Sequence, residues 1–285
     1  MSLKIEVSNK GAELTSIKFN GKEMLHDGKE YWDRQSPVLF PTVGRLRDNK
    51  TIINEKTYEI PQHGFAKDMQ FELVQETQNS KVYMTKSNEE TLKMYPFEFE
   101  LYVEYVIEEN TLTVKYKVIN KDEKDMIFGI GGHPGFKIDL TQEEYYFELE
   151  KKEKNIEFME VEGQYISNEP AKNLLKDDKI IEIEKDSFIN DAIMIKNFKS
   201  KTITLKQKED DEKILEFDMS DFPILAIWTI PKAQYICIEP WFNYADRVME
   251  TGYFKDKEGV LSLKPNQEFN CKFSVKFFVT VQTKI

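Results

Sequence analysis

The chain has 285 residues, 40% of them hydrophobic and 13% aromatic, which is enough to bury a substantial core. With 51 acidic residues against 40 basic ones the net charge is -11, so nucleic acids and anionic membrane surfaces are poor partners. The two cysteines, Cys237 and Cys271, have no closely spaced companion that would indicate a disulfide framework or a zinc site.

The N-terminal segment MSLKIEVSNK lacks the apolar region of a signal peptide, and no stretch of the chain approaches the ~18 apolar residues of a membrane span. We therefore expect a cytoplasmic protein.

Further along, Asn20-Gly21 and Asp27-Gly28 are dipeptides typical of tight turns.

The first irregular segment is SPVLFPTVGRLRD, residues 36–48, where two prolines and a glycine lead to Arg45. An arginine in this setting can extend into a pocket as a fixed fork of hydrogen-bond donors for hydroxyls, carboxylates or phosphates. It can equally cap a surface loop.

The second irregular segment is IPQHGFAKD, residues 60–68. It contains His63, which either has a structural role or contacts a bound molecule.

Alternation with a period of two dominates the rest of the chain and predicts half-buried strands. TLTVKYKVIN, residues 111–120, places Leu112, Val114, Tyr116 and Val118 on one face. FSVKFFVTV places these residues inward: Phe273, Val275, Phe277, Val279 and Val281. Similar runs are FEFELYVEYVI, KIIEIEK, KTITLKQK and KILEFDMS, whereas a turn or two of helix is expected only near EPAKNLL. Strands without intervening helices favour antiparallel sheets packed as a sandwich or a barrel, in one domain over residues 1–285.

GIGGHPGF, residues 129–136, is the third irregular segment and contains His133. The histidine can simply adjoin a turn. Alternatively, the flanking Gly131, Gly132 and Gly135 remove side chains so that a ligand can approach the imidazole closely.

The fourth irregular segment is AQYICIEPWFNYAD, in which an apolar strand runs directly into Glu239. A carboxylate at the end of such a strand is partly desolvated, which raises its pKa toward the range useful for proton transfer. A salt bridge to a lysine on a neighbouring strand is the structural alternative.

Taken together, the irregular segments supply a glutamate, two histidines, an arginine and aromatic rings, a set suited to binding a sugar. The chain has no HExxH or HxH sequence, no GxSxG and no GxGxxG or GxxxxGK[ST]. The sequence therefore does not favour a metal hydrolase, a serine hydrolase or a nucleotide-binding enzyme. We expect no metal and no cofactor.

The motifs SPVLFPTVGRLRD, PQHGFAKD, GGHPGF, NDAIM and CIEPWFNYAD, in this order, resemble the aldose 1-epimerase (galactose mutarotase) family, and more narrowly its bacterial LacX-like branch. The resemblance covers essentially the whole chain. It implies an all-β fold, a large antiparallel β-sandwich called a supersandwich, and the interconversion of the α and β anomers of a free aldose without cofactor or metal. It further implies that His133 is the general acid and Glu239 the general base, and that Arg45, His63 and Asp191 bind the sugar.

The resemblance leaves the substrate open between a free hexose such as galactose or glucose and a hexose 6-phosphate, because Arg45, Arg47 or Lys67 could meet a phosphate. A non-catalytic sugar-binding protein on the same fold is a further alternative, and a glycoside-cleaving enzyme is a third. The expected partner is a small monosaccharide, and both monomer and homodimer remain open. We also expect that a nearby carboxylate, Glu239 or Asp191, raises the pKa of His133 and favours its acid form.

Overall fold

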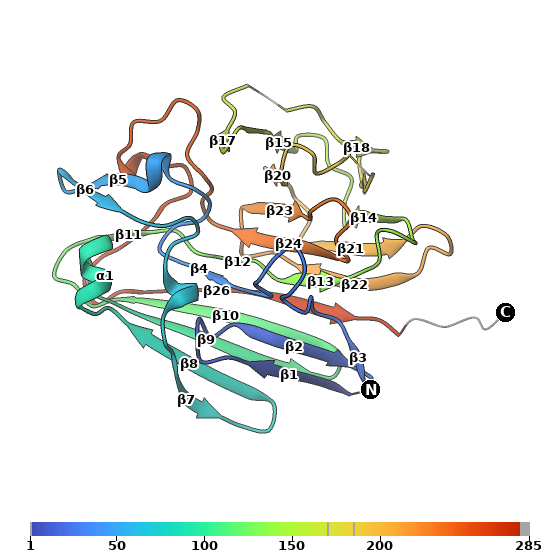
Figure 1. Cartoon of the computed structure of the whole chain (residues 1–285), viewed down its shortest axis with the longest axis horizontal. Helices are drawn as coiled ribbons and strands as arrows, with labels where there is room; N and C mark the ends of the chain where they lie inside the picture. Colours follow the sequence, from blue (N-terminus) through green and yellow to red (C-terminus); the bar gives the residue numbers. More distant parts are fainter. Residues whose placement is uncertain (1, 170, 185, 280–285) are drawn as a thin grey trace.

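The computed structural model describes residues 2–169, 171–184 and 186–279. Two large sheets dominate it, and strands pair antiparallel throughout both. Figure 1 shows the strands of one sheet lying over those of the other, as in a sandwich. The predicted all-β antiparallel sandwich is therefore confirmed, and the barrel alternative is not what the chain forms.

The larger sheet has ten strands whose neighbours are mostly adjacent in sequence. In sheet order they are β18 (Leu175–Lys176), β19 (Ile180–Glu182), β14 (Tyr145–Leu149), β21 (Thr202–Gln207), β22 (Lys213–Asp218), β26 (Glu268–Phe277), β10 (Thr111–Asn120), β9 (Phe99–Glu108), β8 (Ser80–Lys86) and β7 (Glu72–Glu76). Along β10 burial alternates residue by residue, so the predicted inward face of that strand is confirmed.

The last predicted strand is correct only in part. Phe273, Val275 and Phe277 are buried as expected, but β26 ends at Phe277 and Val279 is 54% exposed. The pairing of β26 with β22 ends at Phe277, although the Phe278 amide still donates to the Ile214 carbonyl oxygen at 3.2 Å, and Val279 lies beyond the end of the strand. Val281 lies outside the described residues.

The second sheet has seven strands: β15 (Glu157–Met159), β20 (Ile193–Lys196), β23 (Ile224–Trp228), β24 (Tyr235–Trp241), β12 (Gly131–Gly132), β4 (Val38–Leu39) and, paired with β24, β13 (Gly135–Lys137). Side chains from the facing surfaces of the two sheets form one large apolar core, to which β24 contributes Ile236 and Ile238. The opposite face of β24 points away from that core.

The remaining strands and the 3-10 helices form smaller elements outside the two large sheets. They are β1 (Leu3–Val7), β2 (Leu14–Phe19) and β3 (Lys22–Glu23) in one sheet, the pairs β5 (Lys50–Ile53) with β6 (Lys56–Glu59), β11 (Met126–Phe128) with β25 (Leu261–Leu263) and β16 (Val161–Glu162) with β17 (Tyr165–Ile166), and the 3-10 helices η1 (Arg47–Asn49), η2 (Ala66–Asp68) and η3 (Phe254–Asp256).

The helix expected near EPAKNLL is wrong: residues 171–174 have no regular structure and Leu175 begins β18. The α-helix of the described chain is instead α1 (Glu89–Met94). Its start is marked by a capping box in which the Asn88 side chain accepts from the Thr91 amide while the Thr91 hydroxyl accepts from the Asn88 amide. None of the helices in the described residues has the length and apolar character needed to cross a membrane.

Candidate active site

Strand β24 builds the floor of the site. All seven of its residues are buried, and strand alternation places Tyr235, Cys237, Glu239 and Trp241 together on the face opposite the apolar core. Its neighbour β23 and the short strands β12 and β13 hold this strand from both sides. The carboxylate of Glu239 is consequently fixed in the middle of a sheet rather than at a mobile loop.

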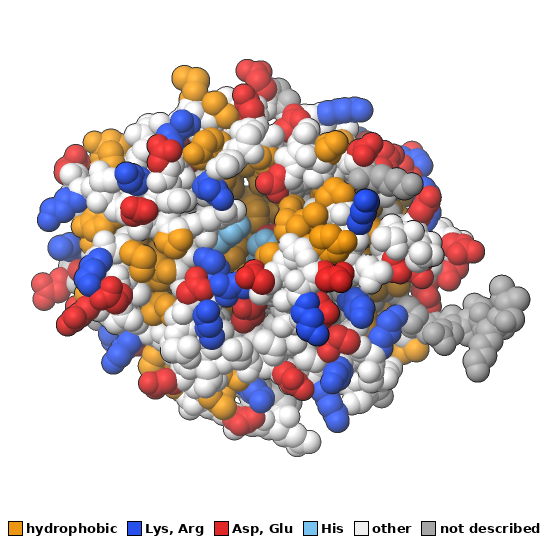
Figure 2. Space-filling view, in the orientation of Figure 1, with side chains coloured by type: hydrophobic (Ala, Val, Ile, Leu, Met, Phe, Trp, Pro, Cys, Tyr) orange, Lys and Arg blue, Asp and Glu red, His pale blue; other side chains and the backbone are white. Residues whose placement is uncertain are grey.

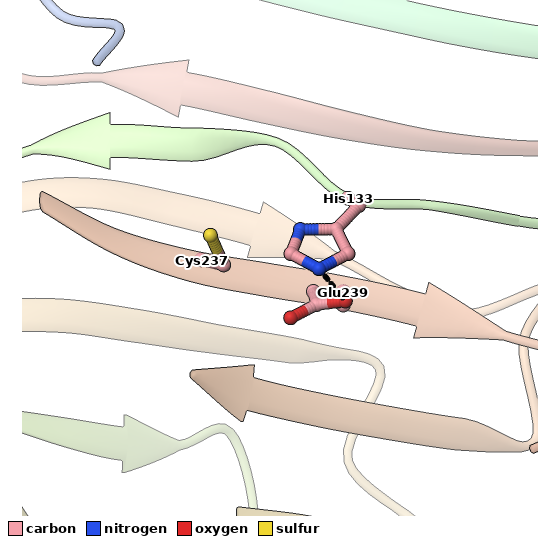
Figure 3. Close-up of side chains that lie close together, drawn as sticks. All are labelled: His133, Cys237 and Glu239. Atoms are coloured by element: carbon pink, nitrogen blue, oxygen red, sulfur yellow. Dashed lines mark ion pairs between the residues drawn. The ribbon is translucent and has the colours of Figure 1, made fainter. Parts of the chain in front are cut away.

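His133 lies in the two-residue break between β12 and β13, directly across from Glu239. Its Nε2 is 3.0 Å from Glu239 Oε2, and the two residues are only 8% and 1% exposed. Figure 3 shows the imidazole ring and the carboxylate pointing toward each other. This contact does not have hydrogen-bond geometry, and within residues 2–169, 171–184 and 186–279 neither Glu239 Oε2 nor His133 Nδ1 has a hydrogen-bond partner.

The glycines around His133 have a different role from the one expected. A Cβ atom on Gly131 would lie 2.7 Å from Trp241 Cδ1, and one on Gly132 would lie 2.9 Å from Phe273 Cε1 in the core. At Gly135 the nearest atom would be Trp32 Cζ3 at 3.1 Å. The missing side chains therefore make room for aromatic rings of the protein itself. The hypothesis that these glycines clear space for a ligand is wrong, because protein rings occupy that space.

Aromatic rings surround the imidazole of His133. The Trp32 ring centroid is 4.8 Å away at 32°, and Trp228 approaches edge-on at 5.7 Å. His63 also lies edge-on, at 5.5 Å. The carbonyl oxygen of Trp32 accepts a hydrogen bond from His26 Nε2 at 3.0 Å, which ties down the loop that carries the indole. The orientation of His133 is thus set by packing against rings.

His63 reaches the site from a strained turn. It has a positive φ of 63°, followed by Gly64 at 71°. Its Nδ1 accepts a hydrogen bond from the Gly44 amide at 3.1 Å, so in the neutral ring the proton is on Nε2. Lys67 closes the same turn, with its ammonium donating to the Gln62 carbonyl at 2.8 Å. His63 therefore carries an N–H donor at Nε2, and the side-chain amide of Gln62 lies 3.4 Å from that nitrogen.

Arg45 and Asp191 stand at the mouth of the site. The Arg45 guanidinium donates to Gln62 Oε1 at 2.6 Å, and no carboxylate of the described chain forms an ion pair with it. Asp191 is exposed and has an unusual φ of 94°, with its carboxylate accepting from the Ala192 amide at 2.8 Å. Both side chains keep hydrogen-bonding capacity for a ligand.

One cavity of about 470 Å³ brings together all five residues named from the sequence, Arg45, His63, His133, Asp191 and Glu239. Figure 2 shows a hollow near the centre of this face, with histidine side chains and hydrophobic surface within it and charged residues around it. The cavity has the size and mixed lining typical of a small-molecule site.

Over residues 1–276 the sequence matches the family described as aldose 1-epimerase. The chain belongs to the aldose 1-epimerase family. Protein LacX of Lactococcus lactis subsp. lactis, in its plasmid form, is 32% identical over 282 residues, which cover 92% of each chain. The chromosomal form of the same protein has the same identity and coverage.

Solved structures extend this result to the fold. A galactose mutarotase related enzyme from Lactobacillus acidophilus superposes with a TM-score of 0.90 and 33% identity, covering 98% of this chain and 96% of that one. A galactose mutarotase-like protein from Lactobacillus casei gives a TM-score of 0.91 with 27% identity, covering 97% of both chains. The sandwich is therefore of the galactose mutarotase-like type.

In this member of the aldose 1-epimerase family, burial governs the charge of the central pair. Burial lowers the pKa of His133 well below its ordinary value. For Glu239 burial raises the pKa well above its ordinary value, and the charge of Asp191 raises it further. The expectation that a carboxylate would raise the His133 pKa is thus wrong, because desolvation dominates and the effect that opposes it is a backbone hydrogen bond rather than a carboxylate.

Four further residues line the cavity: Trp32, Gln62, Trp228 and Trp241. The sequence suggests Trp228 and Trp241 as aromatic surface for a sugar without fixing a role for either, and it gives no role to Trp32 or Gln62. Trp228 fits an aromatic floor as well as it fits core packing, and the sequence does not separate the two. Gln62 directly precedes His63, so the PQHGF motif could have indicated it. Trp32 lies in a polar stretch without periodicity, and no sequence signal identifies it.

Proposed function

We propose that this protein is an aldose 1-epimerase that interconverts the α and β anomers of a free hexose such as galactose or glucose. The observation that carries the proposal is the 3.0 Å approach of His133 Nε2 to Glu239 Oε2 on the floor of the cavity. Two proton-exchanging groups buried together beside a ligand-sized space suit a reaction that only moves protons.

Ring opening requires the C1 hydroxyl to lose a proton while the ring oxygen O5 gains one, as the C1–O5 bond breaks and the aldehyde forms. In the proposed mechanism the Glu239 carboxylate takes the hydroxyl proton and the His133 imidazolium protonates O5. Closure on the other face of the aldehyde reverses both transfers and restores the enzyme. Glu239 is thus the general base of opening and His133 the general acid.

The pair needs only one exchangeable proton for this cycle. A neutral imidazole beside a protonated carboxyl holds as many protons as an imidazolium beside a carboxylate, and burial favours the neutral arrangement before substrate binds. A sugar hydroxyl that donates to Glu239 stabilises its carboxylate. We expect the two side chains, which lie 3.0 Å apart, to turn into hydrogen-bond alignment as the sugar binds, so that the proton passes to His133.

The surrounding residues would hold the sugar. The Nε2–H of His63 and the guanidinium of Arg45 offer donors to its oxygens, and Asp191 accepts from a pair of hydroxyls. The Trp32 and Trp228 rings beside His133 offer apolar surface to the C–H face of a pyranose.

Polarimetry tests the proposal. Wild-type protein should accelerate the change in optical rotation of freshly dissolved α-glucose or α-galactose. Glu239→Gln and His133→Asn should each lower kcat by roughly 10²-fold or more, because positioned acid-base groups contribute 10² to 10⁴. Glu6→Gln, an exposed position on β1, serves as the matched control and should not change the rate. Binding of these sugars without any acceleration would instead identify a non-catalytic sugar-binding protein.

A hexose 6-phosphate is the second candidate substrate, and one observation favours it. The Arg45 guanidinium has no carboxylate partner among the described residues, so its charge is available to a phosphate. Repeating the assay with glucose 6-phosphate separates the two substrates. Arg45→Gln should reduce kcat/KM for the phosphorylated sugar far more than for glucose if the phosphate lies at this residue.

A further inference from the structure

Three potential metal ligands from two separate segments lie close together at the cavity, and two of them, His133 and Glu239, line it. They are an imidazole nitrogen of His133, the thiol of Cys237 and a carboxylate oxygen of Glu239, and these atoms all lie within 4.8 Å of one another. All three residues are buried. Figure 3 shows the side chains of Cys237 and Glu239, both carried by β24, close to the imidazole of His133.

The hydrogen bonding of this cluster is incomplete. Among the described residues, Glu239 Oε2 and His133 Nδ1 are buried polar atoms without a hydrogen-bond partner. Buried polar atoms are almost always paired, and an unpaired one calls for an explanation such as strain, a catalytic role or a bound water or ion. Here the orphaned atoms belong to two of the three clustered side chains.

We propose that these three side chains form a binding site for a thiophilic divalent cation such as Zn²⁺. Thiolate, imidazole and carboxylate are the ligand types that zinc prefers, and three protein ligands with a fourth position open to the cavity leave room for water. Zinc bonds of ~2.0 to 2.3 Å place ligand atoms roughly 3.3 to 3.8 Å apart. A side-chain movement of about 1 Å would therefore bring the three ligand atoms to the distances that zinc coordination requires.

Binding would change both the protons and the chemistry of the site. The Cys237 thiol and the Glu239 carboxyl must release their protons to solvent as they coordinate the ion. Once coordinated, Glu239 and His133 cannot take or give the protons of ring opening. The cation is therefore an inhibitor that competes with the sugar, and this part of the inference rests on the proposed function.

Cobalt substitution tests the site without any activity assay. Co²⁺ added to the full-length protein should produce the near-ultraviolet sulfur-to-cobalt charge-transfer band in the wild type and in Cys271→Ala, and no such band in Cys237→Ala. Cys271 is the matched control, because it is also a buried free thiol but is carried by β26, outside the cluster. Circular dichroism verifies that each variant is folded, and Cys237→Ser provides a second, more conservative replacement.

Zn²⁺ affinity, measured by competition with a chromophoric chelator, should fall more than about 10-fold in Cys237→Ala, since even indirect support of a ligand is worth 10- to 100-fold. No thiolate band in the wild type, or an equal band in folded Cys237→Ala, overturns the site. If the band appears but the protein accelerates no sugar, the proposed function fails and the cation site stands. If activity is present and saturating Zn²⁺ leaves it unchanged, the inhibitory role is wrong.

Discussion

The Gly44 amide donates a hydrogen bond to His63 Nδ1 at 3.1 Å, and this contact determines which ring nitrogen of His63 faces a ligand as a donor. Burial also lowers the pKa of His63 well below its ordinary value, with the neighbouring His133 adding to the effect. The ring is therefore neutral at physiological pH and presents Nε2–H to the cavity. In the proposed enzyme it binds the sugar and takes no part in proton transfer.

Replacing His63 should consequently affect substrate binding more than the chemical step. Loss of one neutral hydrogen bond costs about 1 kcal/mol, so His63→Ala should raise KM by about 5- to 10-fold with a smaller change in kcat. His63→Gln retains an N–H donor of similar reach and should recover part of the loss. Steady-state polarimetry on both variants measures this, and a large fall in kcat at unchanged KM would assign His63 to proton transfer instead.

The turn that carries His63 depends on Gly64. This residue has a φ of +71°, and a Cβ there would lie 2.1 Å from the Phe40 carbonyl oxygen. Gly64→Ala should lower the free energy of unfolding by about 2 to 4 kcal/mol, because the left-handed conformation costs about 1 kcal/mol and the clash adds about 1 to 3.

Gly163 provides the matched control for this prediction. Its φ is +69°, but nothing lies within 4 Å of an added Cβ. Gly163→Ala should therefore cost only about 1 kcal/mol, the backbone contribution alone. Urea unfolding of both variants compares the two values, and equal losses would show that contact with Phe40 is unimportant.

The sequence predicted most of the strands because their signal is local. In β10 the alternation of Leu112, Val114, Tyr116 and Val118 directly reflects one buried face. The same reasoning failed at Val279, because the alternation continues in the sequence beyond Phe277, whereas the pairing of β26 with the distant strand β22 ends there.

The site was predictable to the extent that its residues break the strand pattern. His133 and Glu239 stand where the alternation fails, and the structure brings both into one cavity. The pKa of His133 was not predictable, because desolvation depends on rings from other segments. Nor does the sequence indicate the ligand cluster with Cys237, since His133 comes from the break between β12 and β13, far in the sequence from Cys237 and Glu239.

Trp32 is the clearest residue that the sequence did not reveal, and its removal should affect catalysis. The His133 Nδ1 atom has no hydrogen-bond partner in the described chain. Contact with the Trp32 ring, whose centroid lies 4.8 Å from that of the imidazole, therefore helps to orient His133. An aromatic pair contributes about 0.5 to 1.5 kcal/mol, so Trp32→Ala should lower kcat up to about tenfold. Trp32→Phe keeps a ring and should retain most of the rate. Equal kcat in wild type and a folded Trp32→Ala variant would rule out this orienting role.

Glu258 should make the stability of the protein depend on pH. Partial burial raises the pKa of Glu258, but hydrogen bonds from Lys196, Tyr244 and Arg247 outweigh it and lower the pKa to about 2. Because the folded pKa lies below the ordinary value of 4.5, the stabilisation is fully present above about pH 4.5 and disappears as the pH falls toward 2.

Glu258→Gln should therefore be less stable than wild type by about 1 kcal/mol at pH 7, a value discounted because the side chain is 48% exposed. The difference should shrink between pH 5 and pH 2, since the wild-type carboxyl becomes protonated over that range. Urea unfolding midpoints of the two proteins at a series of pH values measure this. A difference that persists unchanged at the acid end would mean that packing around Glu258, rather than its charge, provides the stabilisation.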